Sequence, residues 1–119
     1  MARVLVVDDE FGIAEVLAAV LEDEGHVVAL AINGRMALAS IKENIPDLII
    51  TDFMMPLMDG PALVRAVQSQ SHLNGIPIVV MSSMPEETIA DRVSGYAQFL
   101  RKPFRIDDVI AIAIKFLPA

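Results

Sequence analysis

The segment Val4-Leu5-Val6-Val7-Asp8-Asp9 is the clearest indication of the fold, because it is a run of four apolar residues that ends in two acids. A continuous apolar run is typical of a strand buried on both faces of a parallel sheet, whereas a half-buried strand alternates apolar and polar residues. The apolar residues that follow recur at helical spacing: Ile13, Val16, Leu17, Val20 and Leu21. Gly25 is placed to end this helix. The chain is therefore predicted to begin with a buried strand followed by an amphipathic helix.

The same alternation continues along the chain. Further strands are predicted over residues 27–31, 47–52, 76–81 and 98–101, and further helices over about 36–42, 61–70, 86–93 and 106–116. The helix over 86–93 is expected to be short or irregular, because Pro85 and Gly95 flank it. Five strands alternating with five helices indicate an α/β fold of repeated βαβ units, with helices on both faces of a parallel sheet. A length of 119 residues suits a single domain, 1–119.

The composition excludes several classes of protein. Sixteen acidic residues against nine basic ones leave a net charge of −7, which disfavours direct binding to nucleic acid. No apolar run approaches the about 20 residues of a membrane span, and the N-terminus lacks the pattern of a signal peptide. The sequence contains no cysteine, so it has no disulfide framework and no thiolate metal site. We therefore expect a cytoplasmic domain that binds neither nucleic acid nor membrane directly.

Polar side chains with complementary chemistry follow four of the five predicted strands. Asp8 and Asp9 follow the first strand, Asp52 ends the third, Ser82 follows the fourth and Lys102 follows the fifth. The ligand crevice of a parallel sheet lies beyond the carboxyl ends of its strands, so these side chains are expected to meet there. Carboxylates without histidine or cysteine favour Mg²⁺ or Mn²⁺, and a lysine with a hydroxyl suits phosphoryl oxygens. Each residue alone could be a helix cap, a turn residue or a solvated charge, but together they indicate a site.

These residues and their spacing resemble the receiver domain of a two-component response regulator. The resemblance rests on Asp8-Asp9, on the segment 52–60 (DFMMPLMDG), on Ser82-Ser83 and on Lys102-Pro103-Phe104, and it extends from Val4 to the last helix. It implies a flavodoxin-like (βα)5 fold, in which a doubly wound parallel sheet of five strands has the order 2-1-3-4-5.

The resemblance also implies a role for each site residue. Asp52 would be the phosphoacceptor, a carboxylate nucleophile that attacks the phosphohistidine of a sensor histidine kinase or phosphotransfer protein. Asp8, Asp9, Asp52 and the backbone carbonyl of Met54 would hold Mg²⁺, with Mn²⁺ as a second option. Lys102 and Ser82 would contact the phosphoryl oxygens.

Ser82 and one further position, Phe99, are implied to form the switch. Ser82 stands where threonine is commoner in this family, and Phe99 stands where tyrosine is frequent. Phosphorylation of Asp52 would shift the equilibrium between two conformations, which a downstream protein target or an output domain missing from this chain would sense. The chain would thus be a signalling switch with slow intrinsic autophosphorylation and autodephosphorylation, and not an enzyme that turns over a substrate.

Two other functions compete with this interpretation. The main alternative is a Mg²⁺-dependent phosphatase with an aspartyl-phosphate intermediate, but such enzymes usually carry a second acid two residues after the nucleophile, where this chain has Met54. A nucleotide-binding module is the other alternative, and the turn after the first strand lacks the glycines that close approach to phosphates requires.

The last predicted helix is apolar on more than one face. The residues expected to pack on the sheet are Ile106, Val109, Ile110, Ala113, Phe116 and Leu117. Because residues 109–114 are all apolar, Ala111, Ile112 and Ile114 are expected to lie partly off that face. A missing output domain or linker could cover them, but we favour a homodimer formed through this helix.

Five methionines flank the expected site: Met54, Met55, Met58, Met81 and Met84. We expect them to fill core and loop space and not to bind metal, because methionine packs adaptably. His26 and His72 lie away from the strand ends and are expected to be surface residues without a role in the site.

Overall fold

The computed structural model describes residues 2–118 as a parallel sheet of five strands in the order β2-β1-β3-β4-β5. Strands and helices alternate: β1 (Arg3–Val7), α1 (Phe11–Asp23), β2 (Val27–Ala31), α2 (Gly34–Glu43), β3 (Leu48–Asp52), α3 (Gly60–Gln68), β4 (Ile78–Ser82), α4 (Glu86–Arg92), β5 (Gln98–Arg101) and α5 (Ile106–Phe116). The predicted fold class, strand order and alternation of elements are confirmed.

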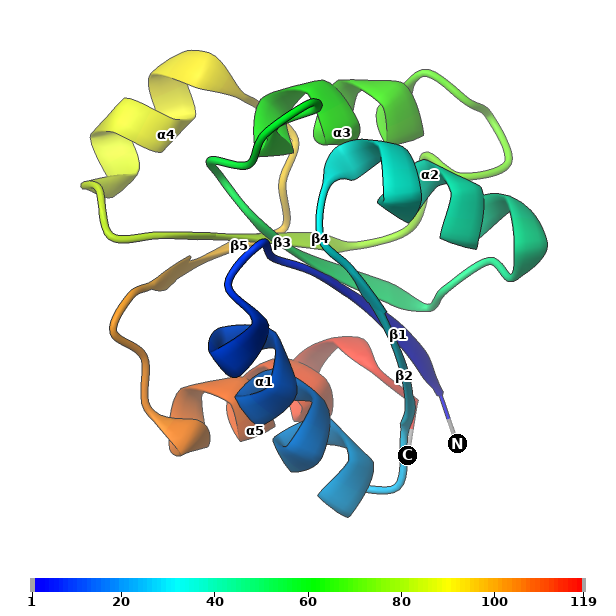
Figure 1. Cartoon of the computed structure of the whole chain (residues 1–119), viewed down its shortest axis with the longest axis vertical. Helices are drawn as coiled ribbons and strands as arrows, with labels where there is room; N and C mark the ends of the chain where they lie inside the picture. Colours follow the sequence, from blue (N-terminus) through cyan, green and yellow to red (C-terminus); the bar gives the residue numbers. More distant parts are fainter. Residues whose placement is uncertain (1, 119) are drawn as a thin grey trace.

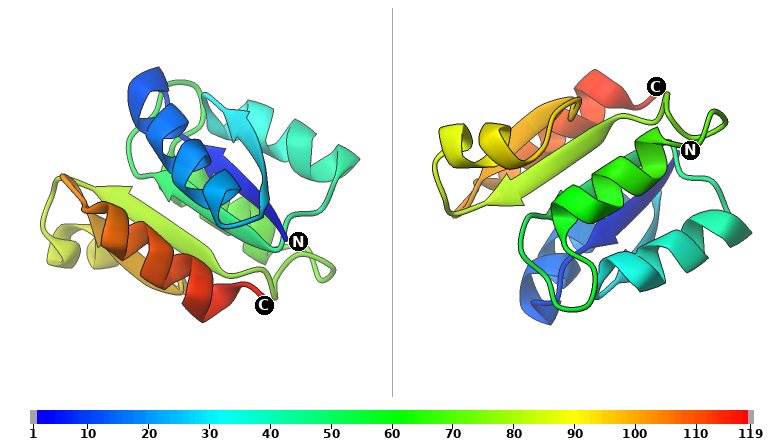
Figure 2. Two further views of the ribbon diagram at one scale, coloured as in Figure 1. Left: turned by 90° about the horizontal axis from the view of Figure 1, so that it is seen from below. Right: turned by 90° about the horizontal axis from the view of Figure 1, so that it is seen from above.

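Helices cover both faces of the sheet (Figure 1). Helices α1 and α5 lie on one face, and α2, α3 and α4 lie on the other, as the views from below and above show (Figure 2). Side chains of β1 alternate between the two layers: Val4 and Val6 belong to the core under α1 and α5, whereas Leu5 and Val7 belong to the core under the other three helices. Both cores need apolar residues from β1, which explains its continuous apolar run.

Local capping residues set where the helices begin and end. The Asn33 side chain accepts a hydrogen bond from the backbone N–H of Met36 at 2.9 Å, so α2 begins at Gly34, two residues before the predicted start. The Asp59 carboxylate likewise caps α3 by accepting from the N–H of Ala62 at 3.0 Å. Gly25, with φ +93°, follows the end of α1 in the left-handed conformation that glycine adopts without strain.

Gly60 brings the start of α3 close to the end of β3. A Cβ at this position would lie 2.5 Å from the carbonyl oxygen of Asp52 and 2.9 Å from the Cα of Phe53. The absence of a side chain therefore allows α3 to begin directly beside the residue predicted to be the phosphoacceptor. On the same side of the sheet, α4 has seven residues, which confirms that this helix is short.

The prediction for the buried face of α5 is wrong at two residues. Ile106 is 56% exposed, and Ile112, which was expected to lie partly off the face, is fully buried. The buried stripe consists of Val109, Ile112 and Ala113 and continues into Leu117 just past the helix. Apolar residues on several faces of a helix leave the hydrophobic period ambiguous, so packing against the sheet decides which stripe is buried.

Within residues 2–118, no helix combines the length and the apolar character needed to cross a membrane.

Candidate functional site

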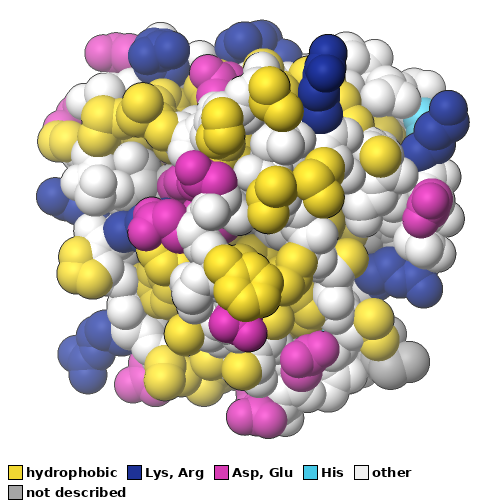
Figure 3. All heavy atoms as spheres, in the orientation of Figure 1, with side chains coloured by type: hydrophobic (Ala, Val, Ile, Leu, Met, Phe, Trp, Pro, Cys, Tyr) yellow, Lys and Arg dark blue, Asp and Glu magenta, His cyan; other side chains and the backbone are white. Residues whose placement is uncertain are grey.

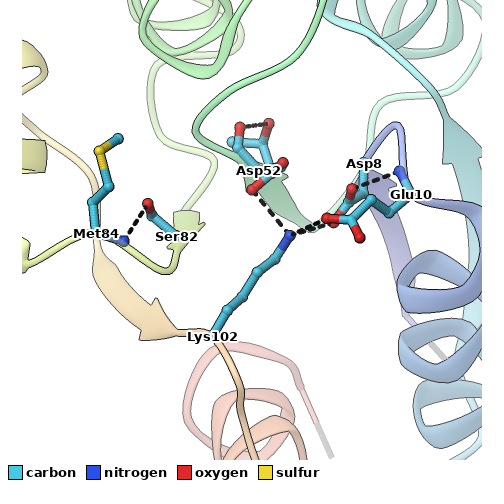
Figure 4. Close-up of polar contacts among 7 residues, drawn as sticks. Asp8, Glu10, Asp52, Ser82, Met84 and Lys102 are labelled. Atoms are coloured by element: carbon cyan, nitrogen blue, oxygen red, sulfur yellow. Dashed lines mark hydrogen bonds and ion pairs between the residues drawn. The ribbon is translucent and has the colours of Figure 1, made fainter.

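The side chains predicted to form a site meet at the carboxyl edge of the sheet (Figure 4). Asp8 directly follows β1, Asp52 ends β3, Ser82 ends β4 and Lys102 directly follows β5. Because β1, β3 and β4 are neighbours in the sheet, Asp8, Asp52 and Ser82 lie side by side, and the long side chain of Lys102 extends toward both carboxylates from the edge strand. Acidic and exposed apolar side chains adjoin one another on the face of the molecule shown in Figure 3.

Lys102 bridges two buried carboxylates. Its Nζ lies 3.0 Å from Asp8 Oδ2 and 3.1 Å from Asp52 Oδ1, and 3.7 Å from Glu10 Oε1. The Asp8 side chain is fully buried and those of Lys102 and Asp52 are 13% and 11% exposed, so water screens these charges only weakly. The lysine thus offsets much of the repulsion between the two acids.

Three carboxylates at this edge form a group that can hold a metal ion. Asp8, Asp9 and Asp52 each offer one oxygen, and these oxygens all lie within 4.8 Å of one another. Asp8 Oδ1 also accepts a hydrogen bond from the backbone N–H of Glu10 at 2.8 Å, which fixes the orientation of that carboxylate. An all-oxygen, anionic set of ligands matches the preference of Mg²⁺ and Mn²⁺. The residues present therefore fit the divalent metal that the sequence predicts.

The environment of Asp52 changes its acidity. Burial disfavours the charged form, and with the nearby charge of Asp8 it raises the pKa of Asp52 from 3.8 to about 6, although Lys102 opposes this change. Burial also disfavours the charged form of Lys102, but its hydrogen bond to Asp8 and the charges of Asp52 and Asp8 raise the pKa of the lysine above its ordinary value. At neutral pH the carboxylate of Asp52 is therefore ionised and Lys102 is positively charged.

Ser82 and two methionines complete the walls of the site. Ser82 is nearly buried, and its Oγ accepts a hydrogen bond from the backbone N–H of Met84 at 3.0 Å while its hydroxyl proton can still be donated. A cavity of about 400 Å³ opens here, and its lining residues are Asp9, Glu10, Asp52, Met54, Ser82, Ser83, Met84 and Lys102. This volume accommodates a phosphoryl group and the end of a donor side chain.

The structure places most, but not all, of the predicted residues in this cavity. Asp8 does not line it but is buried against Lys102, and Met54 lies on its wall and is 65% exposed. Phe99 lies outside the cavity, half-buried in β5 against the core under α2, α3 and α4. Glu10 is a site residue for which no role was predicted, and its position beside the Asp8-Asp9 pair is the signal that could have indicated one.

Two curated regulatory proteins are similar in sequence to most of this chain. The DNA-binding response regulator MtrA of Mycobacterium tuberculosis is 34% identical over 111 residues, which cover 92% of this chain and 47% of MtrA. The transcriptional regulatory protein PrrA of the same species is 37% identical over 111 residues, with the same coverage of 92% and 47%. The chain thus spans about half the length of these curated relatives.

Solved structures of response regulators and receiver domains are similar to this chain in both fold and sequence. The chemotaxis response regulator CheY4 of Vibrio cholerae superposes with a TM-score of 0.88 at 34% identity, covering 98% of this chain and 99% of CheY4. The receiver domain of a signal transduction histidine kinase from Syntrophus aciditrophicus also has a TM-score of 0.88, at 32% identity, with 98% and 90% covered. Residues 4–114 match the response regulator receiver domain family, and the chain therefore belongs to this family of two-component signalling domains.

Proposed function

We propose that this receiver domain is a phosphorylation-dependent switch that accepts a phosphoryl group on Asp52 from a sensor histidine kinase or a phosphotransfer protein. The position of Asp52 carries the proposal, because its carboxylate lines the cavity 3.1 Å from the Nζ of Lys102. The carboxylate is ionised at neutral pH, since even its raised pKa of about 6 lies below 7. A carboxylate oxygen forms the new P–O bond while the P–N bond of the phosphohistidine breaks, and the imidazole keeps the electron pair.

The other side chains of the cavity support this transfer. Mg²⁺ would be held by Asp8, Asp9, Asp52 and the backbone carbonyl of Met54. When bound, it supplies positive charge that offsets the negative charge of the phosphoryl oxygens. Lys102 lies close enough to Asp52 to contact a phosphoryl oxygen once the phosphate is attached.

A change of conformation would follow because the phosphoryl oxygens on Asp52 accept hydrogen bonds from nearby donors. Donation of the Ser82 hydroxyl to the phosphoryl group would draw the loop after β4 inward, because the same oxygen holds the N–H of Met84. Phe99 packs half-buried on the adjacent strand and would change its side-chain position in response. The switch residues are thus Ser82 and Phe99, and phosphorylation shifts a population between two conformations.

A protein surface would sense this change, either on a separate target or on an output domain joined to the receiver. MtrA and PrrA are named for DNA binding and transcriptional regulation, and this chain corresponds to about half of each. We assign no nucleic-acid contact to the receiver itself, because its net charge of −7 repels phosphate backbones. We place its action in the cytoplasm, where a kinase can use ATP to form a phosphohistidine.

Mass spectrometry after incubation with acetyl phosphate and Mg²⁺ tests the proposal. We expect one adduct with the mass of a phosphoryl group, which peptide mapping assigns to Asp52. A phosphatase would instead release phosphate from many small esters with repeated turnover and would accumulate little adduct. Labelling at another residue, or rapid turnover without labelling, would contradict the switch.

Asp9→Asn is expected to weaken Mg²⁺ binding by about tenfold to a hundredfold, because it removes one charged ligand from the cluster. The fold should be unaffected, since Asp9 is exposed at the end of β1. Isothermal titration calorimetry gives the affinity, and circular dichroism checks the fold. Glu15→Gln on the exposed side of α1 is a matched control that should bind Mg²⁺ like the wild type. Equal affinities for all three proteins would remove Asp9 from the metal site.

The phosphorylated state is expected to be long-lived. Hydrolysis needs a water molecule in line with the acyl-phosphate bond, and Met54 and Met84 on the cavity wall orient water poorly. The double change Met54→Asn with Met84→Glu should accelerate loss of the phosphoryl group by about tenfold. Intact-mass spectrometry at intervals after removal of the donor measures the rate. An unchanged or slower rate would contradict the role given to these two positions.

A homodimer through α5 is expected to depend on Ile114. This side chain is 73% exposed and borders a second cavity of about 310 Å³ between α5 and the end of α1. Ile114→Glu should therefore shift the protein to monomer in multi-angle light scattering, whereas Ile45→Glu, at a 52% exposed position after α2, should not. Ile112 is fully buried, so its replacement tests folding and not association. A wild-type protein that is monomeric at all concentrations, with and without beryllofluoride and Mg²⁺, would exclude this dimer.

A further inference from the structure

Methionine is concentrated around the proposed phosphoacceptor. Five of the seven methionines of the sequence lie at the ends of β3 and β4 or in the loops that follow: Met54, Met55, Met58, Met81 and Met84. The sequence contains no cysteine, so methionine is the side chain most susceptible to oxidants in this protein. Packing accounts for the buried members of the group but not for the exposed one.

Solvent access differs strongly among these methionines. Met54 is 65% exposed, whereas Met81 and Met55 are 0% and 9% exposed. Met84 is half-buried, and it lines the site cavity together with Met54. Met36 on α2 is 46% exposed but lies outside this cavity. A soluble oxidant therefore has access to Met54 inside the site and to Met36 outside it, which provides an internal comparison.

Oxidation would change the chemistry of the cavity wall. A thioether is an apolar group and a weak hydrogen-bond acceptor, whereas a sulfoxide is polar and carries a strongly accepting oxygen. Hydrolysis of an aspartyl phosphate depends on a water molecule that a nearby polar group holds in line. A sulfoxide on Met54 or Met84 would add such an acceptor to a cavity that also contains Asp52.

We propose that Met54, together with Met84, is an oxidation site through which peroxide shortens the lifetime of phosphorylated Asp52. This inference rests on the proposed function of the same cavity. In the reaction, a sulfur lone pair attacks one oxygen of hydrogen peroxide, the O–O bond breaks and an S–O bond forms. The departing hydroxide takes the proton of the new S–OH group and becomes water, which leaves the sulfoxide, so that sulfur is oxidised by two electrons and the peroxide is reduced. The sulfoxide oxygen then accepts a hydrogen bond from the attacking water.

Peptide mapping tests the first part without reference to phosphorylation. The folded protein is exposed to hydrogen peroxide, and the sulfoxide at each methionine is quantified over time. We expect Met54 and Met36, which are exposed, to oxidise about tenfold faster than the buried Met81. The half-buried Met84 should oxidise at an intermediate rate. Oxidation of Met54 no faster than that of Met81 would overturn the proposal.

The lifetime of the phosphoryl group tests the second part. Peroxide-treated and untreated protein are labelled with acetyl phosphate and Mg²⁺, the donor is removed, and loss of the adduct is followed by intact-mass spectrometry. We expect about fivefold faster loss from the oxidised protein, the effect of one added hydrogen bond to the attacking water. Treatment with a methionine sulfoxide reductase and a thiol reductant should restore the original rate.

Two variants assign the effect to the cavity. Each is compared with its own untreated form: the double change Met54→Leu with Met84→Leu should lose the response to peroxide, and Met36→Leu should keep it. An oxidised wild type that loses the phosphoryl group at the untreated rate or more slowly would overturn the inference while leaving the proposed function intact. Failure of the untreated protein to label at Asp52 would instead overturn the proposed function.

Discussion

Asp52→Asn should abolish phosphoryl labelling by acetyl phosphate, the largest effect that we expect from any single change. The amide keeps the shape of the side chain but lacks the charged oxygen that attacks phosphorus. Asp9 and Glu10, the other carboxylates that line the cavity, are exposed, and the fully buried side chain of Asp8 does not line it. The adduct should therefore vanish from the intact-mass spectrum and not move to another residue. Labelling of the variant at the wild-type level would refute the assignment of Asp52.

The same variant should be more stable than the wild type when metal is removed. The folded state raises the pKa of Asp52 from 3.8 to about 6, so it binds this proton more tightly than the unfolded state does, and the free energy of unfolding falls as the pH rises through this range. Asp52→Asn removes this loss and should stabilise the protein by about 3 kcal/mol at pH 7, with no difference below about pH 3. Urea unfolding in EDTA at both pH values measures it. Glu22→Gln, on the exposed side of α1, should show neither effect.

Lys102→Met should have the largest destabilising effect. The change leaves Asp8 and Asp52 facing each other, with side chains 0% and 11% exposed and without a cation between them. Removal of one partner from a buried ionic group costs several kcal/mol, and we expect the free energy of unfolding to fall by about 3 kcal/mol at pH 7 in EDTA. Labelling should also fall by about a hundredfold, because the lysine no longer contacts the phosphoryl oxygens.

The pH dependence separates this mechanism from a simple loss of packing. The pKa of Lys102 is raised, so its stabilising contribution is fully present below the ordinary value of 10.5 and disappears only at higher pH. The defect of the variant follows the carboxylates instead: without Lys102 the pKa of Asp52 rises further, so the defect should shrink as the pH falls and Asp52 takes up a proton. Urea unfolding at pH 7 and pH 4.5 measures this, with Lys42→Met on exposed α2 as control. Equal destabilisation at both pH values would indicate lost packing only.

Much of the fold was predictable because its signals are local. The run 4–7 is apolar because both faces of β1 are buried, and the strands observed agree with the predicted ranges to within two residues. Asn33, Asp59 and Gly25 mark the ends of helices by contacts or conformations within a few residues of themselves. The placement of Asp8, Asp52 and Ser82 at one edge was equally predictable, because parallel strands deliver their carboxyl ends to the same side of the sheet.

The order of the elements, the parallel sheet and the group of residues at its carboxyl edge could thus be inferred from residue patterns. The burial of Ile112 in place of Ile106 follows only from packing against the sheet, because an apolar helix has no periodicity that selects one stripe. The fold also brings Lys102 to Asp8, 94 residues away, and buries Asp52 so that its pKa rises. These properties depend on the distances between segments far apart in the chain and on how far each side chain is exposed to water. Local residue patterns encode neither quantity.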